Sequence, residues 1–112
     1  MSQSDEGELL WQPSATRIGN SGLMAYRAWL NRESGLSFDD YDALWRWSIE
    51  NPALFWESIW RCYDIAPGQD YTDVLTSNGM PGARWFPGTQ LNFAEYLLRQ
   101  GDRGDPARVA VF

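Results

Sequence analysis

Two patterns in the sequence predict a mainly α-helical domain with irregular loops rich in proline and glycine. Four stretches carry apolar residues at spacings of three and four, and each follows residues typical of a helix start. The long stretch between the third and the fourth holds three Pro-Gly pairs and one Asn-Gly pair, which mark turns. An alternating, β-branched run closes the chain and is typical of a strand. We therefore expect helices joined by turns, with strand structure confined to short segments.

The core of this domain is expected to be aromatic. The chain has 112 residues, enough for one domain or a piece of one. Leu, Ile, Val and Phe make up 23 of them, close to the fraction of ~20% below which chains are often disordered. The 7 Trp and 5 Tyr shift the balance, because each large ring buries ~150–250 Å². A globular fold is therefore expected.

Three absences in the composition exclude several classes of enzyme. The chain has no histidine, a single cysteine at Cys62, and arginine for all nine of its basic residues. Ser-His-Asp and Cys-His catalysis within the chain is therefore excluded, as are an internal disulfide, a cysteine zinc site, a P-loop lysine and a Schiff-base lysine. Any chemistry within this chain would depend on carboxylates, arginine, tyrosine or backbone dipoles.

The net charge argues against two classes of partner. It is −6 at neutral pH, with a pI of about 4.4. Nucleic acid and anionic membrane surfaces repel such a chain, because phosphate binding depends on clustered positive charge. No apolar stretch approaches 18 residues, and the acidic first six residues are unlike a signal or transit peptide. We expect a cytoplasmic protein that binds neither nucleic acid nor membrane.

One helix is expected in the N-terminal third of the chain. Residues 1–8 are polar and expected to be a disordered tail, and a loop is expected over 13–20. Ser21 is a typical N-cap for a helix over 22–33, which Gly35 ends by adopting a left-handed conformation. The inward face of this helix consists of Leu23, Tyr26 and Leu30.

Two more helices are expected in the middle of the chain. The first begins within 37–40, which resembles a capping box with acidic residues in the first turn. The next has Asn51 as its N-cap and Pro52 as its first residue, and runs to about Asp64. Its apolar stripe should pack against the preceding helix or another domain, because water disfavours such a surface. The stripe consists of Phe55, Trp56, Ile59, Trp60 and Tyr63.

The last helix has the clearest start. Asn92 is its N-cap, Glu95 completes a capping box, and Gly101 is expected to close it. Its buried face is expected to be Ala94, Leu97 and Leu98. Short extended segments are expected before it, at 71–76 and 84–86. The run in the final five residues needs neighbouring strands, so the chain is interpreted as part of a larger protein.

Several motifs resemble one family, the acetoacetyl-CoA synthetases. They are LWQPS at 10–14, DYDALWRWS at 40–48, FW at 55–56, MPGARWFPG at 80–88 and LNFAE at 91–95. The part over 85–92 is similar to acetyl-CoA and propionyl-CoA synthetases as well. The resemblance implies a helical N-terminal extension over 9–105 and, over 106–112, the first strand of a missing α/β adenylation domain.

The resemblance also implies a two-step ligation by the full-length enzyme. ATP and acetoacetate would form acetoacetyl-AMP, and CoA would then displace AMP to give the thioester, with Mg²⁺ as the metal. Family members use a phosphate loop ending in lysine and a second catalytic lysine, and this chain contains no lysine. No catalytic, cofactor-binding or metal-binding residue is therefore assigned, and the chain is interpreted as scaffold.

The most specific part of the resemblance predicts a docking segment. Its residues are Trp85, Phe86, Pro87, Gly88, Leu91, Asn92 and Glu95. We expect Trp85 and Phe86 to bury their rings, and the segment to pack on the missing adenylation domain beside the side that CoA enters. The alternative is a free-standing aromatic-rich module that stacks on a ligand or docks on a full-length synthetase.

Overall fold

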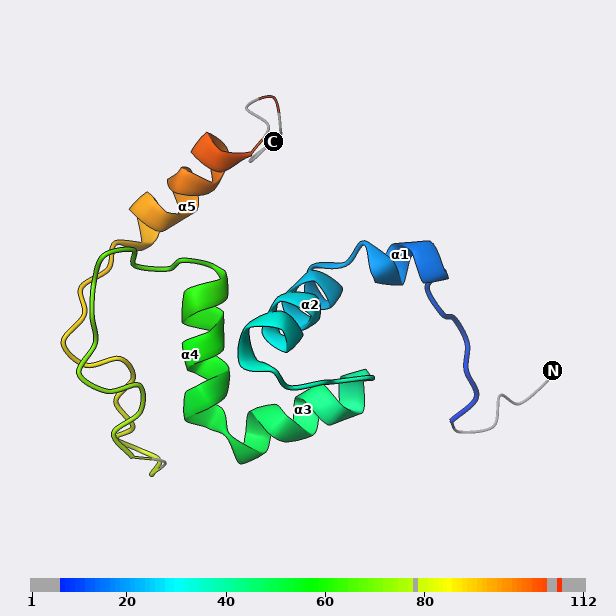
Figure 1. Ribbon diagram of the computed structural model, residues 1–112, viewed down its shortest axis with the longest axis horizontal. Helices are drawn as coiled ribbons and strands as arrows, with labels where there is room; N and C mark the ends of the chain where they lie inside the picture. Colours follow the sequence, from blue (N-terminus) through cyan, green and yellow to red (C-terminus); the bar gives the residue numbers. More distant parts are fainter. Residues whose placement is uncertain (1–6, 78, 105–106, 108–112) are drawn as a thin grey trace. The chain divides into compact units, whose positions relative to one another are not determined.

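The chain's structure is a computed structural model that describes residues 7–77, 79–104 and 107. Its contacts divide the chain into two units, Met1–Asp40 and Tyr41–Phe112. The described residues form five helices, which confirms the mainly α fold (Figure 1). The run at 108–112 and most of the tail at 1–8 lie outside the described residues.

The first unit contains α1 (Ala15–Gly19) and α2 (Gly22–Ser34). The backbone N–H of Arg17 donates to Ser14 Oγ, which caps α1, a short helix where a loop was expected. The N–H of Met24 donates to Ser21 Oγ at the start of α2, and Gly35 ends α2 at φ 70°. The predicted start of α2 and its glycine C-cap are therefore confirmed, as is the burial of Tyr26 and Leu30, but Leu23 is 45% exposed and not on the inward face. The expectation of a loop over 13–20 was wrong for α1.

The segment after α2 folds back onto that helix. The N–H of Phe38 donates to Asn31 Oδ1 at 3.1 Å, and Arg27 Nη1 donates to the carbonyl oxygen of Asp39 at 3.1 Å. Backbone groups expected to open the next helix are therefore bonded to side chains of α2. For this reason α3 (Tyr41–Glu50) begins later than the predicted start within 37–40.

The second unit starts with α3 and α4 (Pro52–Cys62). Pro52 is the first residue of α4, as predicted. Asn51 makes no side-chain capping bond, because its Nδ2 donates back to the carbonyl oxygen of Trp47 at 3.3 Å. Asn51 therefore occupies the predicted N-cap position of α4, but its side chain bonds to the end of α3 instead of capping α4. The α4 helix stops at Cys62, short of the expected Asp64, which has a left-handed φ of 50°.

The aromatic stripe of α4 packs mainly against the loop that follows it. Trp60 is 8% exposed and stacks on Phe86 with ring centroids 4.3 Å apart. Tyr71 meets both rings edge-on, at 5.8 and 5.3 Å. Phe55 contacts Trp47 of α3, at 6.3 Å. The preceding helix therefore contacts only Phe55 of the stripe in these ring pairs, the 71–86 region covers Trp60, and Trp56 and Tyr63 remain 44% exposed.

The two extended segments predicted at 71–76 and 84–86 pair with each other (Figure 1). Leu75 and Trp85 form an antiparallel bridge. Backbone hydrogen bonds continue the pairing on either side, from Thr72 to Pro87, from Phe86 to Val74 and from Thr76 to Arg84. The pairing holds the Phe86 ring against α4.

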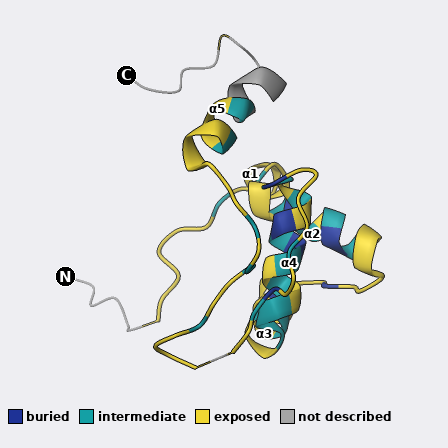
Figure 2. Cartoon of the chain, turned by 90° about the vertical axis from the view of Figure 1, so that its left-hand side faces the viewer, coloured by how far each residue is buried: buried dark blue, intermediate teal, exposed yellow. Residues whose placement is uncertain are grey.

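The last helix, α5 (Phe93–Arg103), differs from expectation in two ways. It continues through Gly101 and ends at Gly104, which has extended backbone. The face expected to be buried is exposed at Ala94, Leu97 and Leu98. Figure 2 shows no buried residue in the described part of α5.

Replacing Trp60 should unfold the second unit more readily than replacing its exposed neighbour. Trp60→Ala leaves a cavity between Phe86 and Tyr71 and should cost about 3–5 kcal/mol of unfolding free energy. Trp56 is 44% exposed, so Trp56→Ala is the matched control and should cost clearly less. Chemical denaturation of both variants measures the difference, and equal losses would contradict a central role for Trp60.

Candidate functional site

The predicted docking segment, residues 85–95, is held by side chains and backbone from three parts of the second unit. Phe86 anchors its start through the stack on Trp60. The N–H of Phe86 donates to the Val74 carbonyl oxygen at 2.9 Å, and its own carbonyl oxygen accepts from Thr89 Oγ1 at 2.7 Å. Its φ is 45°, a left-handed value that bulky residues seldom adopt. These contacts stabilise that unusual backbone.

Pro87 and Gly88 form the turn that follows. The Pro87 carbonyl oxygen accepts from both the backbone N–H and the Oγ1 of Thr72, at 3.1 and 3.0 Å. Gly88 has φ 89°, and a Cβ there would lie 3.3 Å from Thr72 Cγ2. Both backbone conformation and close approach therefore require glycine here. The expectation of one defined turn agrees with this geometry.

Trp85 is not buried as expected. It is 44% exposed and meets Trp56, also 44% exposed, edge-on with ring centroids 6.0 Å apart. The bridge with Leu75 explains the difference, because neighbouring residues of a strand point to opposite sides. With Phe86 turned toward Trp60, Trp85 points away from that ring stack and remains half in solvent.

The second half of the segment starts α5. The N–H of Glu95 donates to Asn92 Oδ1 at 3.1 Å, so the predicted cap is confirmed. The N–H of Gln90 donates to Gln69 Oε1 at 3.0 Å, which ties the approach to the helix. Leu91 and Glu95 are exposed. The segment therefore combines a fixed backbone with outward-facing Trp85 and Leu91.

Arg99 and Tyr96 attach α5 to the end of α4. Arg99 Nη2 donates to the carbonyl oxygens of Asp64 and Ile65, at 2.7 and 3.2 Å. Tyr96 Oη donates to the carbonyl oxygen of Tyr63 at 3.3 Å, and the Arg99 guanidinium lies 5.2 Å from the Tyr96 ring centroid. These bonds satisfy the carbonyl groups of residues 63–65, which directly follow the last residue of α4.

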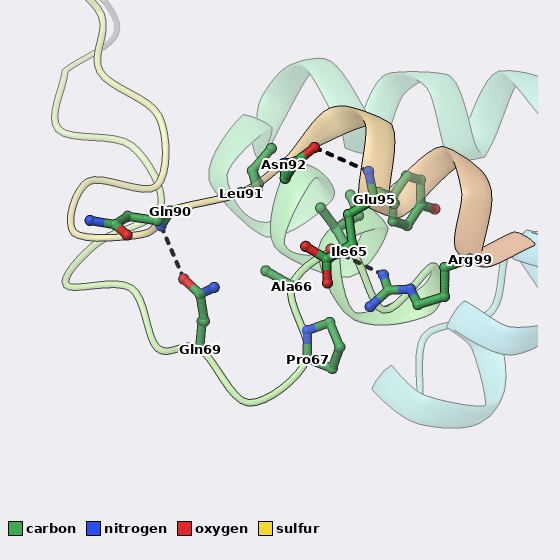
Figure 3. Close-up of a pocket in the computed structure, with 10 residues that line it drawn as sticks. Ile65, Ala66, Pro67, Gln69, Gln90, Leu91, Asn92, Glu95 and Arg99 are labelled. Atoms are coloured by element: carbon green, nitrogen blue, oxygen red, sulfur yellow. Dashed lines mark hydrogen bonds between the residues drawn. The ribbon is translucent and has the colours of Figure 1, made fainter.

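A cavity of about 360 Å³ lies between α5 and the start of the loop (Figure 3). Its lining is largely polar and includes Ala66, Gln69, Gln90, Asn92, Glu95 and Arg99. One carboxylate and one guanidinium share the wall, and the guanidinium already donates to two carbonyl groups. We assign it no catalytic role, because this arrangement includes no nucleophile next to a base.

A second polar cluster joins α4 to the loop. Tyr71 Oη donates to Glu57 Oε1 at 2.6 Å, and Arg61 Nη2 lies 3.1 Å from the same oxygen. Burial raises the pKa of Tyr71, and the Glu57 carboxylate raises it further. The phenol therefore keeps its proton at neutral pH and serves as a structural donor. Burial likewise raises the pKa of Tyr63.

Comparison with known proteins assigns the chain to a family. Residues 41–96, half of the chain, match the sequence pattern described as the acetyl-coenzyme A synthetase N-terminus. The chain belongs to this family. The matched range contains α3, α4, the paired segments and the start of α5.

Three longer proteins illustrate the similarity. Acetoacetyl-CoA synthetase from Macaca fascicularis is 34% identical over 109 residues, which cover 96% of this chain and 16% of the relative. Malonamoyl-CoA synthetase from Penicillium aethiopicum is 33% identical over 93 residues, or 81% of this chain and 13% of the relative. The solved structure of acetoacetyl-CoA synthetase from Streptomyces lividans has 37% identity and a TM-score of 0.77, covering 88% of this chain and 15% of that one. The chain thus spans about a sixth of such relatives.

Two further findings concern metal and membrane. Within the described ranges, no three His, Cys, Asp or Glu residues gather into a group that could hold an ion. No magnesium ligand is assigned within these ranges. In the same part of the chain, no helix has the length and apolar character needed to cross a bilayer.

Sequence reasoning singled out residues 85–95 but missed the residues that hold this segment in place. Thr72 and Gln69 lie in a loop, and their bonds to Pro87 and Gln90 span 15 and 21 residues. Arg99 spans 35 residues to reach Asp64. No periodic pattern signals such bonds. One sequence signal could have located Tyr96 and Arg99, namely the amphipathic pattern of α5, which places both residues on the side opposite its leucines.

Removing the α5 cap should loosen this helix locally. Asn92→Ala deletes the oxygen that accepts from Glu95 and should cost about 1 kcal/mol. Amide hydrogen exchange across α5 should then accelerate about fivefold. Asn92→Ser keeps a capping oxygen and should stay close to the unsubstituted chain. Unchanged exchange in Asn92→Ala would show that the cap does not stabilise α5.

The bond between Tyr71 and Glu57 should make stability fall at alkaline pH. The folded state raises the Tyr71 pKa above its ordinary value of 10.0, so the stabilisation is complete below that value. It is lost as pH rises through the folded-state pKa, because the unfolded phenol ionises first. Unfolding free energies of the original chain and Tyr71→Phe, compared from about pH 8 to about pH 11, should show a smaller alkaline loss in the variant. An equal loss in both would contradict this role.

Proposed function

We propose that this chain forms the N-terminal part of an acetoacetate–CoA ligase and acts there as scaffold. The proposed ligase converts acetoacetate, ATP and CoA to acetoacetyl-CoA, AMP and pyrophosphate, in the cytoplasm. The observation that carries the proposal is the backbone match to the Streptomyces lividans acetoacetyl-CoA synthetase, at a TM-score of 0.77. The absence of lysine and histidine from the chain supports a scaffold rather than a catalyst.

The choice of acetoacetate as substrate rests on the relatives' names. Several relatives, including the one from Macaca fascicularis, are acetoacetyl-CoA synthetases. A malonamoyl-CoA synthetase matches at nearly the same identity, so this region does not by itself select the acyl group. We assign that selection to the remaining part of the ligase, where ATP, Mg²⁺ and CoA would also bind.

Within this ligase, the docking segment at 85–95 is proposed to pack against the adenylation domain beside the side that CoA enters. Three features support this. The backbone is rigid, because Phe86, Pro87 and Gly88 are each bonded or confined by neighbouring residues. Trp85 and Leu91 keep much of their surface free for contact. Rigid segments lose little entropy on docking.

The alternative, a free-standing aromatic binding module, has weaker support. Flat ligands need aromatic faces that lie parallel and open. Trp56 and Trp85, each 44% exposed, meet at 69°, so the edge of one ring lies against the face of the other. Trp60, Phe86 and Tyr71 are occupied with one another. The geometry is that of a packed cluster with one exposed flank.

A hybrid enzyme tests the proposal. Residues 9–104 of this chain would replace the matched region of the Streptomyces lividans synthetase. The hybrid should release pyrophosphate when given acetoacetate, ATP and CoA, whereas the isolated chain should release none. A soluble hybrid without activity would overturn the proposed function.

Trp85→Ala in the hybrid tests the docking segment. If Trp85 contributes about 1 kcal/mol of contact near the CoA side, the KM for CoA should rise about fivefold. The KM for ATP should stay nearly constant. Trp56→Ala removes the same edge contact from the other side and should leave the KM for CoA unchanged. Unchanged kinetics in Trp85→Ala would end the docking role of this segment.

A further inference from the structure

The amphipathic helix α5 is attached to the second unit by its polar side. Tyr96 and Arg99 donate to the carbonyl oxygens of residues 63–65, which directly follow α4. At about 100° per residue, these two positions lie near one another on the helix surface. Phe93, Ala94, Leu97 and Leu98 occupy an arc of about 140° on the opposite side. We call these four residues the α5 apolar face.

The α5 apolar face is exposed to a degree that is unusual for an apolar helix stripe. Phe93 is 73% exposed, Leu97 59% and Leu98 74%, and Ala94 is exposed as well. In globular proteins such a stripe normally faces a core. Water disfavours a continuous apolar surface of this kind, which typically marks an interaction site.

The helix presents this face in a fixed orientation. Asn92 caps its first turn, and the Arg99 guanidinium fastens its middle to the carbonyl oxygens of Asp64 and Ile65, as Figure 3 shows for the cap and for Arg99. The attachments described for Tyr96 and Arg99 are hydrogen bonds to backbone carbonyl groups, and Phe93, Leu97 and Leu98 remain exposed. A partner can therefore bury the face without rearranging the helix.

The occupant can be inferred from charge and length. The face itself carries no charge, so its partner should be apolar. A second copy of this chain brings a net charge of −6 against −6, which opposes self-association. The relatives that contain this region are about six times as long, so each places roughly 84% of its residues outside it. The rest of the ligase is therefore the available partner.

We propose that the α5 apolar face is the main surface by which this chain packs on the rest of the ligase. This inference rests on the proposed function. It assigns the centre of the contact to Phe93, Leu97 and Leu98 of α5, at the C-terminal end of the docking segment and just beyond it. Tyr96 and Arg99 attach α5 to the residues that follow α4, and the leucines on its other side bury against the rest of the ligase.

Hydroxyl-radical footprinting of the isolated chain and of the hybrid enzyme tests this assignment. Burying side chains now 59–74% exposed to below about 10% should slow oxidation of Leu97 and Leu98 about sixfold in the hybrid. An active hybrid in which both leucines oxidise as fast as in the isolated chain would overturn the inference and leave the proposed function intact. A hybrid with protected leucines but no activity would overturn the function and support the contact.

Leu97→Glu provides a second readout. Glutamate and leucine have similar helix propensities, so the isolated variant should keep its helix content by circular dichroism. In the hybrid, it should shift thermal unfolding several degrees lower, because a charge would enter an apolar interface. Leu54→Glu, at a site on α4 that is 53% exposed, is the matched control and should shift the hybrid little.

Self-association is the remaining outcome. If the isolated chain sediments as a dimer with protected leucines, and Leu97→Glu restores the monomer, the face belongs to a second copy and the inference is overturned. A monomeric isolated chain with rapidly oxidised leucines supports the assignment to the ligase.

Discussion

The stack of Trp60 on Phe86 connects the two halves of the second unit. Trp60 belongs to α4 and Phe86 to the loop that follows, and Tyr71 closes the cluster edge-on. Rings of this size contribute both burial and oriented contacts. A left-handed backbone at Phe86 is tolerated because the ring stack and the pairing with Val74 both hold it in place. The path of the chain from α4 to α5 depends on this contact.

Hydrogen bonds from side chains to the backbone hold distant segments of this chain together, as the backbone bonds of a sheet do in other small domains. Asn31 bonds to Phe38, Thr72 to Pro87, and Gln69 to Gln90. Each bond joins a loop to a segment at least seven residues away and satisfies a backbone group that lacks a regular partner. A chain with few aliphatic residues can in this way keep irregular loops in one conformation.

The two sides of α5 differ in what they contact: one side bonds to this chain, and the other is exposed. Arg99 and Tyr96 donate hydrogen bonds to backbone carbonyl groups just after α4, so they stabilise the fold of this chain itself. Phe93, Leu97 and Leu98 face solvent, and we have proposed that they pack on the rest of the ligase. Membership of the acetyl-coenzyme A synthetase N-terminus family is consistent with that division, since the relatives are several times longer.

Local signals in the sequence determined four of the five described helices and the starts of three of them, α2, α4 and α5. Ser21, Pro52 and Asn92 mark starts through bonds or φ values within three residues, and such short-range effects can be read directly. The glycine at 88 was also readable, because Pro-Gly defines a turn. The family motifs are local strings, so the resemblance could be recognised without a fold.

The tertiary structure determined the outcome wherever a group from elsewhere in the chain bonded to a group that a local pattern had assigned to a helix start. Arg27 and Asn31 bond to backbone groups of residues 38 and 39, where α3 was expected to begin. The side-chain amide of Asn51, expected to cap α4, donates to the carbonyl oxygen of Trp47 instead. The pleat of the paired segments turned Trp85 outward, and polar anchors at Tyr96 and Arg99 turned the leucines of α5 to solvent. Apolar periodicity indicates which residues share a helix face. It does not say which side is attached, because that depends on hydrogen-bond partners up to 35 residues away.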